Sequence, residues 1–270
     1  MTAPAAQDAV ATAGRIVVKV GSSSISGERA AQLGPLVDAL AGAHARGAEI
    51  VLVSSGAIAT GMPYLRLQER PTDLAVQQAA AAVGQSLLVK RYQERLDRFG
   101  VTAAQVLLTA SDIDNPTHRR NAERALETLL SLRILPIVNE NDTVATHEIR
   151  FGDNDRLAAL VARLLRADLL VLLSDVDALY TRPPEEPGAE RIPFVAAGDP
   201  LTDVLVTETN TGVGTGGAAT KLAAARMAAE VGIAVLLTAT DRVEAALSGE
   251  RVGTWFQPAV TKAPQEQPAF

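Results

Sequence analysis

The chain has 270 residues, 47% of them hydrophobic and 21% charged, with a formal net charge of −6. This length and composition are typical of a globular protein of one or two domains. The acidic balance and the few aromatic residues (5 Phe, 3 Tyr and 1 Trp) argue against nucleic acid binding, which uses basic surfaces and aromatic stacking. Since the chain has no Cys, disulfides, thiolate catalysis and Cys-ligated zinc are excluded.

Targeting and metal signals are lacking as well. Residues 1–13 have neither the cationic start nor the apolar run of a signal peptide, and no run of ~18 apolar residues predicts a membrane span. The three histidines, His44, His118 and His147, are too far apart to form a metal-ligand spacing. We therefore expect a cytoplasmic protein whose own side chains hold no metal.

The predicted elements alternate between short apolar runs and helical patterns. The expected strands are Arg15–Val20, Glu49–Val53, Val101–Leu108, Ile134–Val138, Asp168–Leu173 and Ile233–Leu237. Three helices follow from apolar residues at three- and four-residue spacing: Leu33, Leu36, Val37, Leu40; Val76, Ala80, Val83, Leu87; and Leu157, Leu160, Val161, Leu164. A further helix is expected from 217 to about 231. This alternation predicts an α/β fold, a three-layer αβα sandwich with a mostly parallel central sheet.

Few segments break this pattern. Residues 1–14 are expected to be a disordered N-terminus, 15–257 a single domain and 258–270 a flexible tail rich in Pro and Gln. A Pro/Glu loop is expected at 183–188. Within the domain we expect an N-lobe over 15–165 and a C-lobe over 166–257.

Polar residues follow the first two predicted strands. Lys19 lies between two valines, where its charge is costly unless it meets an anion, and Gly21 and Ser22 would let backbone N–H groups approach that anion. The alternative is a tight turn with a surface lysine. Ser55 and Gly56 could offer a helix N-terminus to a carboxylate or phosphate, or form a plain helix cap.

Two polar clusters lie between residues 136 and 155. Asn139 and Asp142 follow an apolar strand, and Asp153, Asn154 and Asp155 precede a helix. Such residues also serve as turns and caps. Two clusters joined by a strand-like spacer (144 to 149) would nevertheless gather carboxylates and amides at one end of the sheet, where they could bind an α-ammonium group or hold a lysine or a metal.

The glycine-rich run 211–221 matches the dinucleotide fingerprint G-x-G-x-x-G at Gly212, Gly214 and Gly217. It follows TETN instead of an apolar strand, so the context disfavours a dehydrogenase. Its glycines, the following helix and Lys221 fit a polyphosphate cradle better. Ser174 and Asp175, at the end of another strand, could contact a nucleotide or form a turn.

Two lysines with glycine loops and no histidine base favour phosphoryl transfer, which depends on positioning and charge neutralisation. Lys19 and Lys221 could flank the transferred group, with Asp155 between them, while Mg²⁺ shares the phosphate oxygens of ATP. A carboxylate acceptor, with a reference pKa of ~4.3 for Glu, is already ionised and needs no base.

Seven segments in order resemble the glutamate 5-kinases of the amino-acid kinase superfamily: VVKVGSSS, VLVSSGAIATG, AAVGQ, PIVNENDTVA, FGDND, LLSDVDALYT and GTGGAATK. The resemblance runs from about Arg15 to about Phe256. It implies the amino-acid kinase fold and transfer of the ATP γ-phosphoryl group to the side-chain carboxylate of L-glutamate, the first step of proline biosynthesis. It also implies a glutamate-binding N-lobe, an ATP-binding C-lobe, feedback inhibition by proline, and a homodimer or homotetramer.

The candidate site residues fall into three groups by role. The catalytic candidates are Lys19, Lys221 and Asp155. The glutamate-binding candidates are Ser55, Gly56, Asn139, Asp142, Asp153 and Asn154. The ATP-binding candidates are Gly21, Ser22, Ser174, Asp175, Thr215, Gly216, Gly217, Ala218, Ala219, Thr220 and Lys221.

The chain departs from the family pattern in two ways. Ala178 stands where the family usually has Gly, and no room remains before Phe270 for the C-terminal PUA domain of many members. Either this is a short form of the family, as we expect, or the sequence is a piece of a longer chain. Aspartate kinase, acetylglutamate kinase and UMP kinase are the rival enzymes, and NENDTVA with GDND favours glutamate among them. A sensor that binds ATP or an amino acid is the non-catalytic alternative, which the two lysines disfavour.

Overall fold

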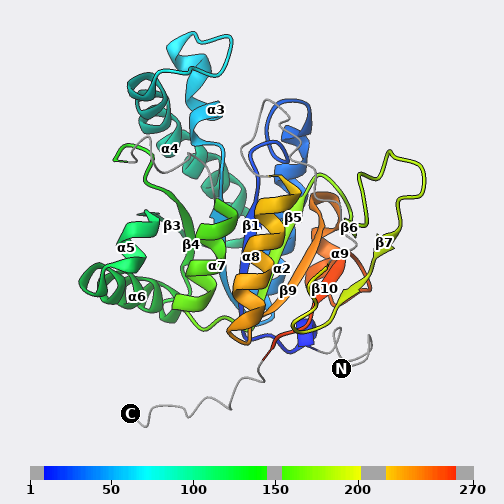
Figure 1. Ribbon diagram of the computed structural model, residues 1–270. Coiled ribbons are helices and arrows are strands. Elements are labelled where there is room, and N and C mark those ends of the chain that lie inside the picture. The colour runs from blue at the N-terminus through cyan, green and yellow to red at the C-terminus, as the bar shows by residue number, and fades with distance from the viewer. Residues whose placement is uncertain (1–8, 145–153, 202–216, 260–270) are drawn as a thin grey trace.

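Six parallel strands form the centre of the molecule (Figure 1). The computed structural model describes residues 9–144, 154–201 and 217–259. In sheet order these strands are β3 (Ala103–Leu108), β4 (Leu135–Glu140), β2 (Glu49–Ser54), β1 (Arg15–Val20), β5 (Leu169–Ser174) and β9 (Ala234–Ala239). Each corresponds to a predicted strand, and the ends differ by two residues at most.

The sheet is completed by two short strands that the sequence did not reveal. β10 (Thr254–Phe256) pairs antiparallel with β9, and β8 (Phe194–Val195) pairs with β10. β6 (Leu179–Tyr180) and β7 (Arg191–Ile192) form a separate antiparallel pair around the predicted loop at 183–188.

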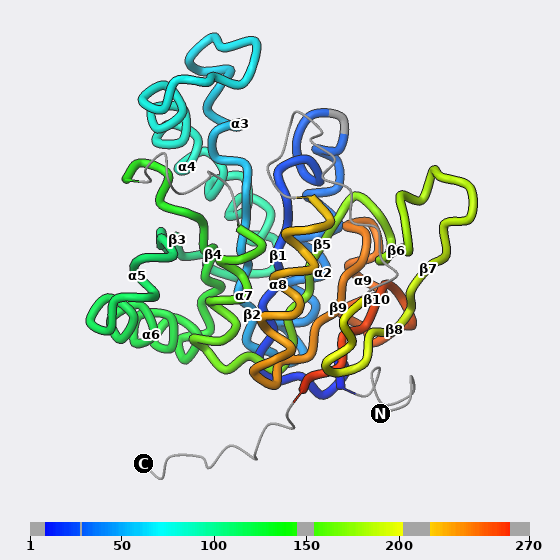
Figure 2. Tube along the Cα trace, in the orientation of Figure 1, coloured from blue at the N-terminus to red at the C-terminus, as the bar shows by residue number. Residues whose placement is uncertain are grey.

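Helices cover both faces of the sheet, which confirms the predicted three-layer sandwich (Figure 2). One core contains side chains of α2 (Leu33–Ala45), α4 (Leu74–Leu96) and α9 (Val243–Leu247). The other contains side chains of α5 (Ala110–Asp114), α6 (Pro116–Ser131), α7 (Asn154–Leu164) and α8 (Ala218–Glu230). Short elements complete the fold: α3 (Ala57–Gly61) and the 3-10 helices η1 (Gly27–Gln32), η2 (Met62–Leu65), η3 (Asp97–Phe99) and η4 (Thr240–Arg242). Within the described ranges, no helix is long and apolar enough to cross a membrane.

The buried face of α4 differs from the predicted stripe. Val76, Val83 and Leu87 are only half-buried, while Ala81, Gly84, Gln85, Leu88 and Tyr92 are buried. The reason is α3, which lies directly against α4: a Cβ at Gly84 would lie 1.8 Å from the Ala57 carbonyl oxygen. A contact between two backbones turns the smallest residues of α4 inward.

The chain ends are better ordered than expected near the domain. Residues 9–11 are helical, and the apolar side chain of Val10 is buried in the first core, so the expected disorder of 1–14 is wrong for this part. At the other end, the Ala259 N–H still donates to the Ala229 carbonyl (2.8 Å).

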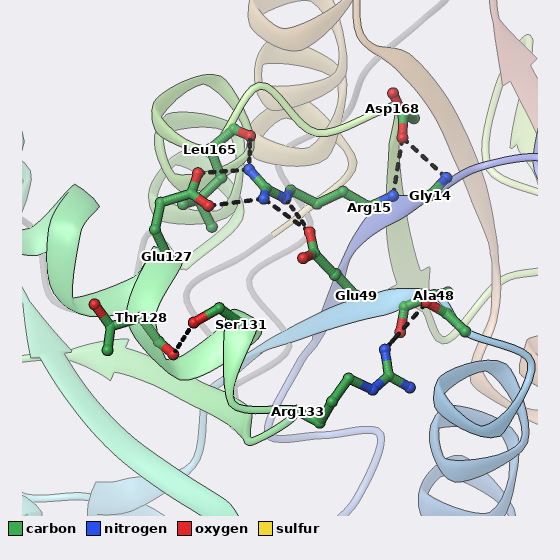
Figure 3. Close-up of polar contacts among 11 residues, drawn as sticks. Gly14, Arg15, Ala48, Glu49, Glu127, Thr128, Ser131, Arg133, Leu165 and Asp168 are labelled. Carbon is green, nitrogen blue, oxygen red and sulfur yellow. Dashed lines mark hydrogen bonds and ion pairs between the residues drawn. The ribbon is translucent and has the colours of Figure 1, made fainter. Parts of the chain in front are cut away.

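An ionic cluster joins the amino ends of β1 and β2 to α6 (Figure 3). The Arg15 guanidinium donates to Glu49 (2.8 Å), to both carboxylate oxygens of Glu127 (2.6 and 2.8 Å) and to the Leu165 carbonyl (2.6 Å). The Asp168 carboxylate accepts from the backbone N–H of Arg15 (2.8 Å). A bidentate arginine of this kind fixes the orientation of its partners.

Candidate active site

The candidate residues gather where the parallel strands end, at the upper edge of the sheet in Figure 1. In a parallel sheet the carboxyl ends of all strands meet at one edge, and there the helices that follow present their N-termini. The last residues of β1, β4 and β5, the loops after β1, β2, β4 and β5, and the first turns of α7 and α8 carry the described candidates.

At the centre of this edge, Asp155 lies between two lysines. Lys19, in β1, places its Nζ 2.5 Å from Oδ1 of Asp155, and Lys221, in α8, places its Nζ 3.4 Å from Oδ2. All three residues are buried: Lys19 is 3% exposed, Lys221 7% and Asp155 1%. Residues 19, 155 and 221 are therefore brought together as the sequence predicts, although they are far apart in the chain.

The lysines decide the charge of this carboxyl group. Burial acts to raise the pKa of Asp155, but the charges of Lys19 and Lys221 and the hydrogen bonds it accepts lower it to about 2. Burial and the neighbouring Lys19 lower the pKa of the Lys221 amine, and Asp155 opposes them. The cluster thus holds two cations around one buried anion, which leaves an excess of positive charge to attract a further anion.

A hydroxyl group lies closer to the second oxygen of Asp155 than the Lys221 amine does. Thr220, in the first turn of α8, donates from Oγ1 to Oδ2 of Asp155 (2.8 Å), and its Oγ1 also lies 3.0 Å from the Gly217 carbonyl. Asp155 is therefore bound to both halves of the chain, by Lys19 on one side and by α8 on the other.

The loops after β1 and β2 touch at Gly56. This residue has a φ of +106°, in the left-handed region that favours glycine, and a Cβ there would lie 3.3 Å from that of Ser22. The Ser55 N–H donates to the Val20 carbonyl (3.2 Å). Beneath them, the Ser54 hydroxyl is 2.9 Å from the buried Tyr92 hydroxyl, which fixes the end of β2 against α4.

A buried amide network holds the end of β4. Asn139 donates from Nδ2 to Gln85 (3.1 Å) and accepts from the Glu140 N–H (2.9 Å), while Gln85 donates to the Glu140 carbonyl (3.1 Å). Beyond it, burial and the charge of Glu140 raise the pKa of Asp142 to about 7, against the opposing charge of Arg70. A buried carboxylate that is so costly to ionise favours a cationic ligand group.

Asn154 offers a further polar atom at this edge. It is buried, and its Oδ1 has no hydrogen-bond partner within the part of the chain that the structure describes. A buried amide oxygen without a partner costs free energy, so a polar ligand at this point would be stabilised.

The end of β5 is tied to the loop after β1. Asp175 accepts from the buried Ser24 hydroxyl (2.9 Å) and pairs with the Arg29 guanidinium. Ser174 is half-buried, and its carbonyl accepts from the Thr240 hydroxyl (3.3 Å). Asp175 also lies close enough to Lys221 to affect its pKa, so this end belongs to the same electrostatic cluster.

The remaining candidates lie around α8 or outside the described residues. Gly217 is the N-cap of α8, and Ala218 and Ala219 form its first turn, whose backbone N–H groups suit an anion. Gly21 lies beside Lys19: a Cβ added to Gly21 would lie 3.8 Å from Nζ of Lys19. Asp153, Thr215 and Gly216, and the spacer beyond residue 144, lie outside the described residues. Among the described residues, no three His, Cys, Asp or Glu side chains are grouped to hold a metal.

Four polar residues at this edge escaped the sequence analysis. Gln85 stands in the quoted segment AAVGQ, yet only the fold reveals its partners on β4. Ser24 ends the quoted segment VVKVGSSS, but no partner was expected for it; Arg29 looks like an ordinary loop residue, and Arg70 stands in a polar connection. Each is recognised through a partner far away in the chain, which no local pattern encodes.

Comparisons with known sequences point to one group of enzymes. The model of the amino acid kinase family matches residues 14–239. The glutamate 5-kinase of Clavibacter michiganensis subsp. michiganensis is 72% identical, over 94% of this chain and 98% of that protein. The glutamate 5-kinase of Leifsonia xyli subsp. xyli is 70% identical, over 96% and 97%. The one from Thermobifida fusca is 53% identical over 96% of this chain, but the match spans only 68% of that longer protein.

Solved structures share the fold at low sequence identity. Carbamate kinase from Giardia lamblia bound to AMP-PNP has a TM-score of 0.65 at 15% identity and covers 92% of this chain and 99% of its own. UMP kinase from Bacillus anthracis has a TM-score of 0.58 at 13% identity, with 92% and 97% covered. At such identities the structural similarity supports a shared fold only.

Proposed function

Because the chain belongs to the glutamate 5-kinases of the amino acid kinase family, we propose that it transfers the γ-phosphoryl group of ATP to the side-chain carboxylate of L-glutamate. The product is L-glutamyl 5-phosphate, and the reaction is the first step of proline biosynthesis. The structural observation that carries the proposal is the buried pair of lysines on Asp155.

This pair suits the reaction because the acceptor needs no general base. A side-chain carboxylate is ionised at neutral pH, so the obstacle is repulsion between two anions as they approach. Lys19 and Lys221 offset that repulsion, since fixed cations in a buried site stabilise the charge of the transition state. Asp155 sets their positions by binding one ammonium group on each of its oxygens.

Glutamate would bind between the loops after β2 and β4 and the start of α7. Asp142 is the partner for the α-ammonium group, and Oδ1 of Asn154, which has no partner among the described residues, is a ligand for the substrate. Ser55 and Gly56 would contact it from the β2 loop, and Asn139 would shape the pocket through Gln85. Asp153 is a further candidate by its place in the sequence.

ATP would bind on the other side of Asp155, between the end of β5 and the start of α8. The expected ligands are Gly21 and Ser22, Ser174 and Asp175, and residues 215–221. Mg²⁺ would arrive with the nucleotide and neutralise its β- and γ-phosphate oxygens, because this ion commonly keeps several waters and binds substrate phosphates. The carboxylate of Asp175 fits such a hydrated ion.

Regulation and assembly follow the family in this proposal. We expect proline to act as a feedback inhibitor, the chain to form a homodimer or homotetramer, and the enzyme to work in the cytoplasm. Proline and glutamate share an α-ammonium and an α-carboxylate group, so competition for Asp142 is the simplest form of this inhibition.

The deciding experiment is an acceptor panel with the purified chain. ATP-dependent hydroxamate formation is measured with glutamate, aspartate and N-acetylglutamate, and ADP release with UMP, using Lys19→Ala as the inactive control. Activity with glutamate that Lys19→Ala loses supports the proposal. Activity with another acceptor only, or ATP binding without turnover, would reject it in favour of a rival kinase or a sensor.

A further inference from the structure

The hydroxyl group of Tyr92 is buried together with an apolar core, on the inner face of α4. Tyr92 is fully buried, and so is Ser54, the last residue of β2, whose Oγ lies 2.9 Å from the Tyr92 hydroxyl. A phenylalanine at this position would fill the same space without a polar atom to bury. Since a buried hydroxyl without a partner costs free energy, the bond to Ser54 is what makes a tyrosine acceptable here.

The direction of this bond follows from a second contact of Ser54. Its hydroxyl donates to the Ser55 carbonyl (3.2 Å), and a serine has only one hydroxyl proton to give. Tyr92 is therefore the donor in the bond to Ser54. Burial raises the pKa of Tyr92, so the phenol keeps the proton that it donates.

This chain of hydrogen bonds ends on the peptide group that joins Ser55 to Gly56. The peptide bond is trans, so its carbonyl and its N–H point in opposite directions. Because the Ser55 carbonyl accepts from the buried Ser54 hydroxyl, the Gly56 N–H points away from that hydroxyl. No acceptor within the described ranges binds the Gly56 N–H. The contacts of Tyr92 and Ser54 thus set the orientation of a peptide group in the loop proposed to contact glutamate.

We propose that Tyr92 is a positioning residue for the glutamate site, acting through Ser54 on the peptide between Ser55 and Gly56; this inference rests on the proposed function. Tyr92 has no exposed surface with which to touch a substrate. Without its hydroxyl, the Ser54 side chain is held by the longer contact to the Ser55 carbonyl alone, and the loop after β2 is less firmly placed. ATP is expected on the other side of Asp155, so the loss should fall on glutamate.

The test compares Tyr92→Phe, which removes only the hydroxyl, with Ser54→Ala and with the double variant. We expect Tyr92→Phe and Ser54→Ala each to raise the KM for glutamate about three- to ten-fold, the size of one hydrogen bond between neutral groups. The kcat should stay within about three-fold, and the calorimetric Kd of a non-hydrolysable ATP analogue within about two-fold. Because both hydroxyls belong to one chain of contacts, the double variant should exceed the larger single effect by no more than about two-fold.

Tyr64→Phe is the matched control, because it makes the same chemical change at a tyrosine of η2 that is 62% exposed. It should leave the KM for glutamate and the analogue Kd unchanged. Thermal unfolding is recorded for every variant, since a buried hydrogen bond also contributes to stability. The comparison of glutamate with the ATP analogue then separates positioning from a general loosening of the fold.

Three results would overturn the inference while the wild type phosphorylates glutamate. One is a KM for glutamate of Tyr92→Phe equal to that of Tyr64→Phe. Another is an equal loss of affinity for glutamate and for the ATP analogue, which would make Tyr92 a structural residue only. The third is a double variant whose KM rises by the product of the single effects, since the two hydroxyls would then act independently. A wild-type chain without glutamate kinase activity would overturn the proposed function itself, and this inference with it.

Discussion

Replacing Gly84 with alanine tests the close packing of α3 on α4. Added to the backbone, a Cβ at Gly84 would lie 1.8 Å from the Ala57 carbonyl oxygen and 2.7 Å from the Gly61 nitrogen. Ordinary contacts begin near 3.4 Å, so the two helices must separate by about 1.5 Å. Neither neighbour is a flexible side chain that could move away.

Two opposing effects decide whether Gly84→Ala raises or lowers the free energy of unfolding. Glycine to alanine inside a helix gains about 1 kcal/mol in propensity, whereas overpacking costs about 1–3 kcal/mol, and a contact between two backbones belongs at the upper end. The free energy of unfolding should therefore fall by about 2 kcal/mol. For a chain of this size that lowers Tm by about 4 °C or more.

The assay is thermal unfolding, together with the KM for glutamate, because α3 begins two residues after Ser55 and α4 carries Gln85. Gly42→Ala is the matched control: Gly42 lies inside α2, and its nearest neighbour would be the flexible end of Arg46 at 3.7 Å. This control should raise stability by up to about 1 kcal/mol. If Gly84→Ala is as stable as Gly42→Ala, the described packing of α3 on α4 is refuted.

Three further predictions concern the charged groups of the site. Since burial and Glu140 raise the pKa of Asp142 to about 7, its carboxyl group is neutral below this pH; the KM for glutamate should rise as pH falls from 8 to 6, and a constant KM would remove Asp142 from the pocket. Asp155→Asn should lower the free energy of unfolding in urea by about 3–5 kcal/mol at pH 7, because two buried ammonium groups lose their counterion, whereas the exposed Glu94→Gln should cost less than about 1 kcal/mol. With the pKa of Asp155 near 2, this contribution disappears only as pH falls from about 4 to 2, and equal midpoints for wild type and variant at pH 7 would contradict the buried cluster. Lys19→Ala should lower kcat at least 100-fold with little change in the KM for glutamate, and a loss confined to KM would contradict a transition-state role.

Five of the six parallel strands, all but β3, were predictable because each contains a run of apolar residues that is buried on both faces of the sheet. β3 lies at the edge of the sheet and is only half-buried. β8 and β10 were not predictable, since strands of two or three residues are defined by their partners and not by their own pattern. α6 carries a start signal, Asn115 followed by Pro116, but the sequence analysis did not include it. The inward face of α4 was misjudged because hydrophobicity alone cannot show that a backbone packs against Gly84.

In the candidate site as well, the sequence predicted the residues with a local signal and missed the contacts that depend on the fold. Lys19 was recognised because a charge within an apolar run needs an anion. Asp155 was selected as the carboxylate between the two lysines, and the structure pairs it with Lys19. The geometry of Thr220 was not recognised, since its segment resembles a nucleotide loop and its partner lies on another helix. Charge identifies the members of a buried cluster, but the fold decides which of them touch.

The Arg15 cluster places a network of ion pairs at the edge of the sheet opposite the reacting groups (Figure 3). Arg15 and the catalytic candidate Lys19 therefore lie about four residues, or ~13 Å, apart along β1. Loops at the upper edge can accumulate substitutions without loosening the roots of β1 and β2. A mutant library confined to residues 141–144 would thus explore new carboxylic acid acceptors on an intact scaffold.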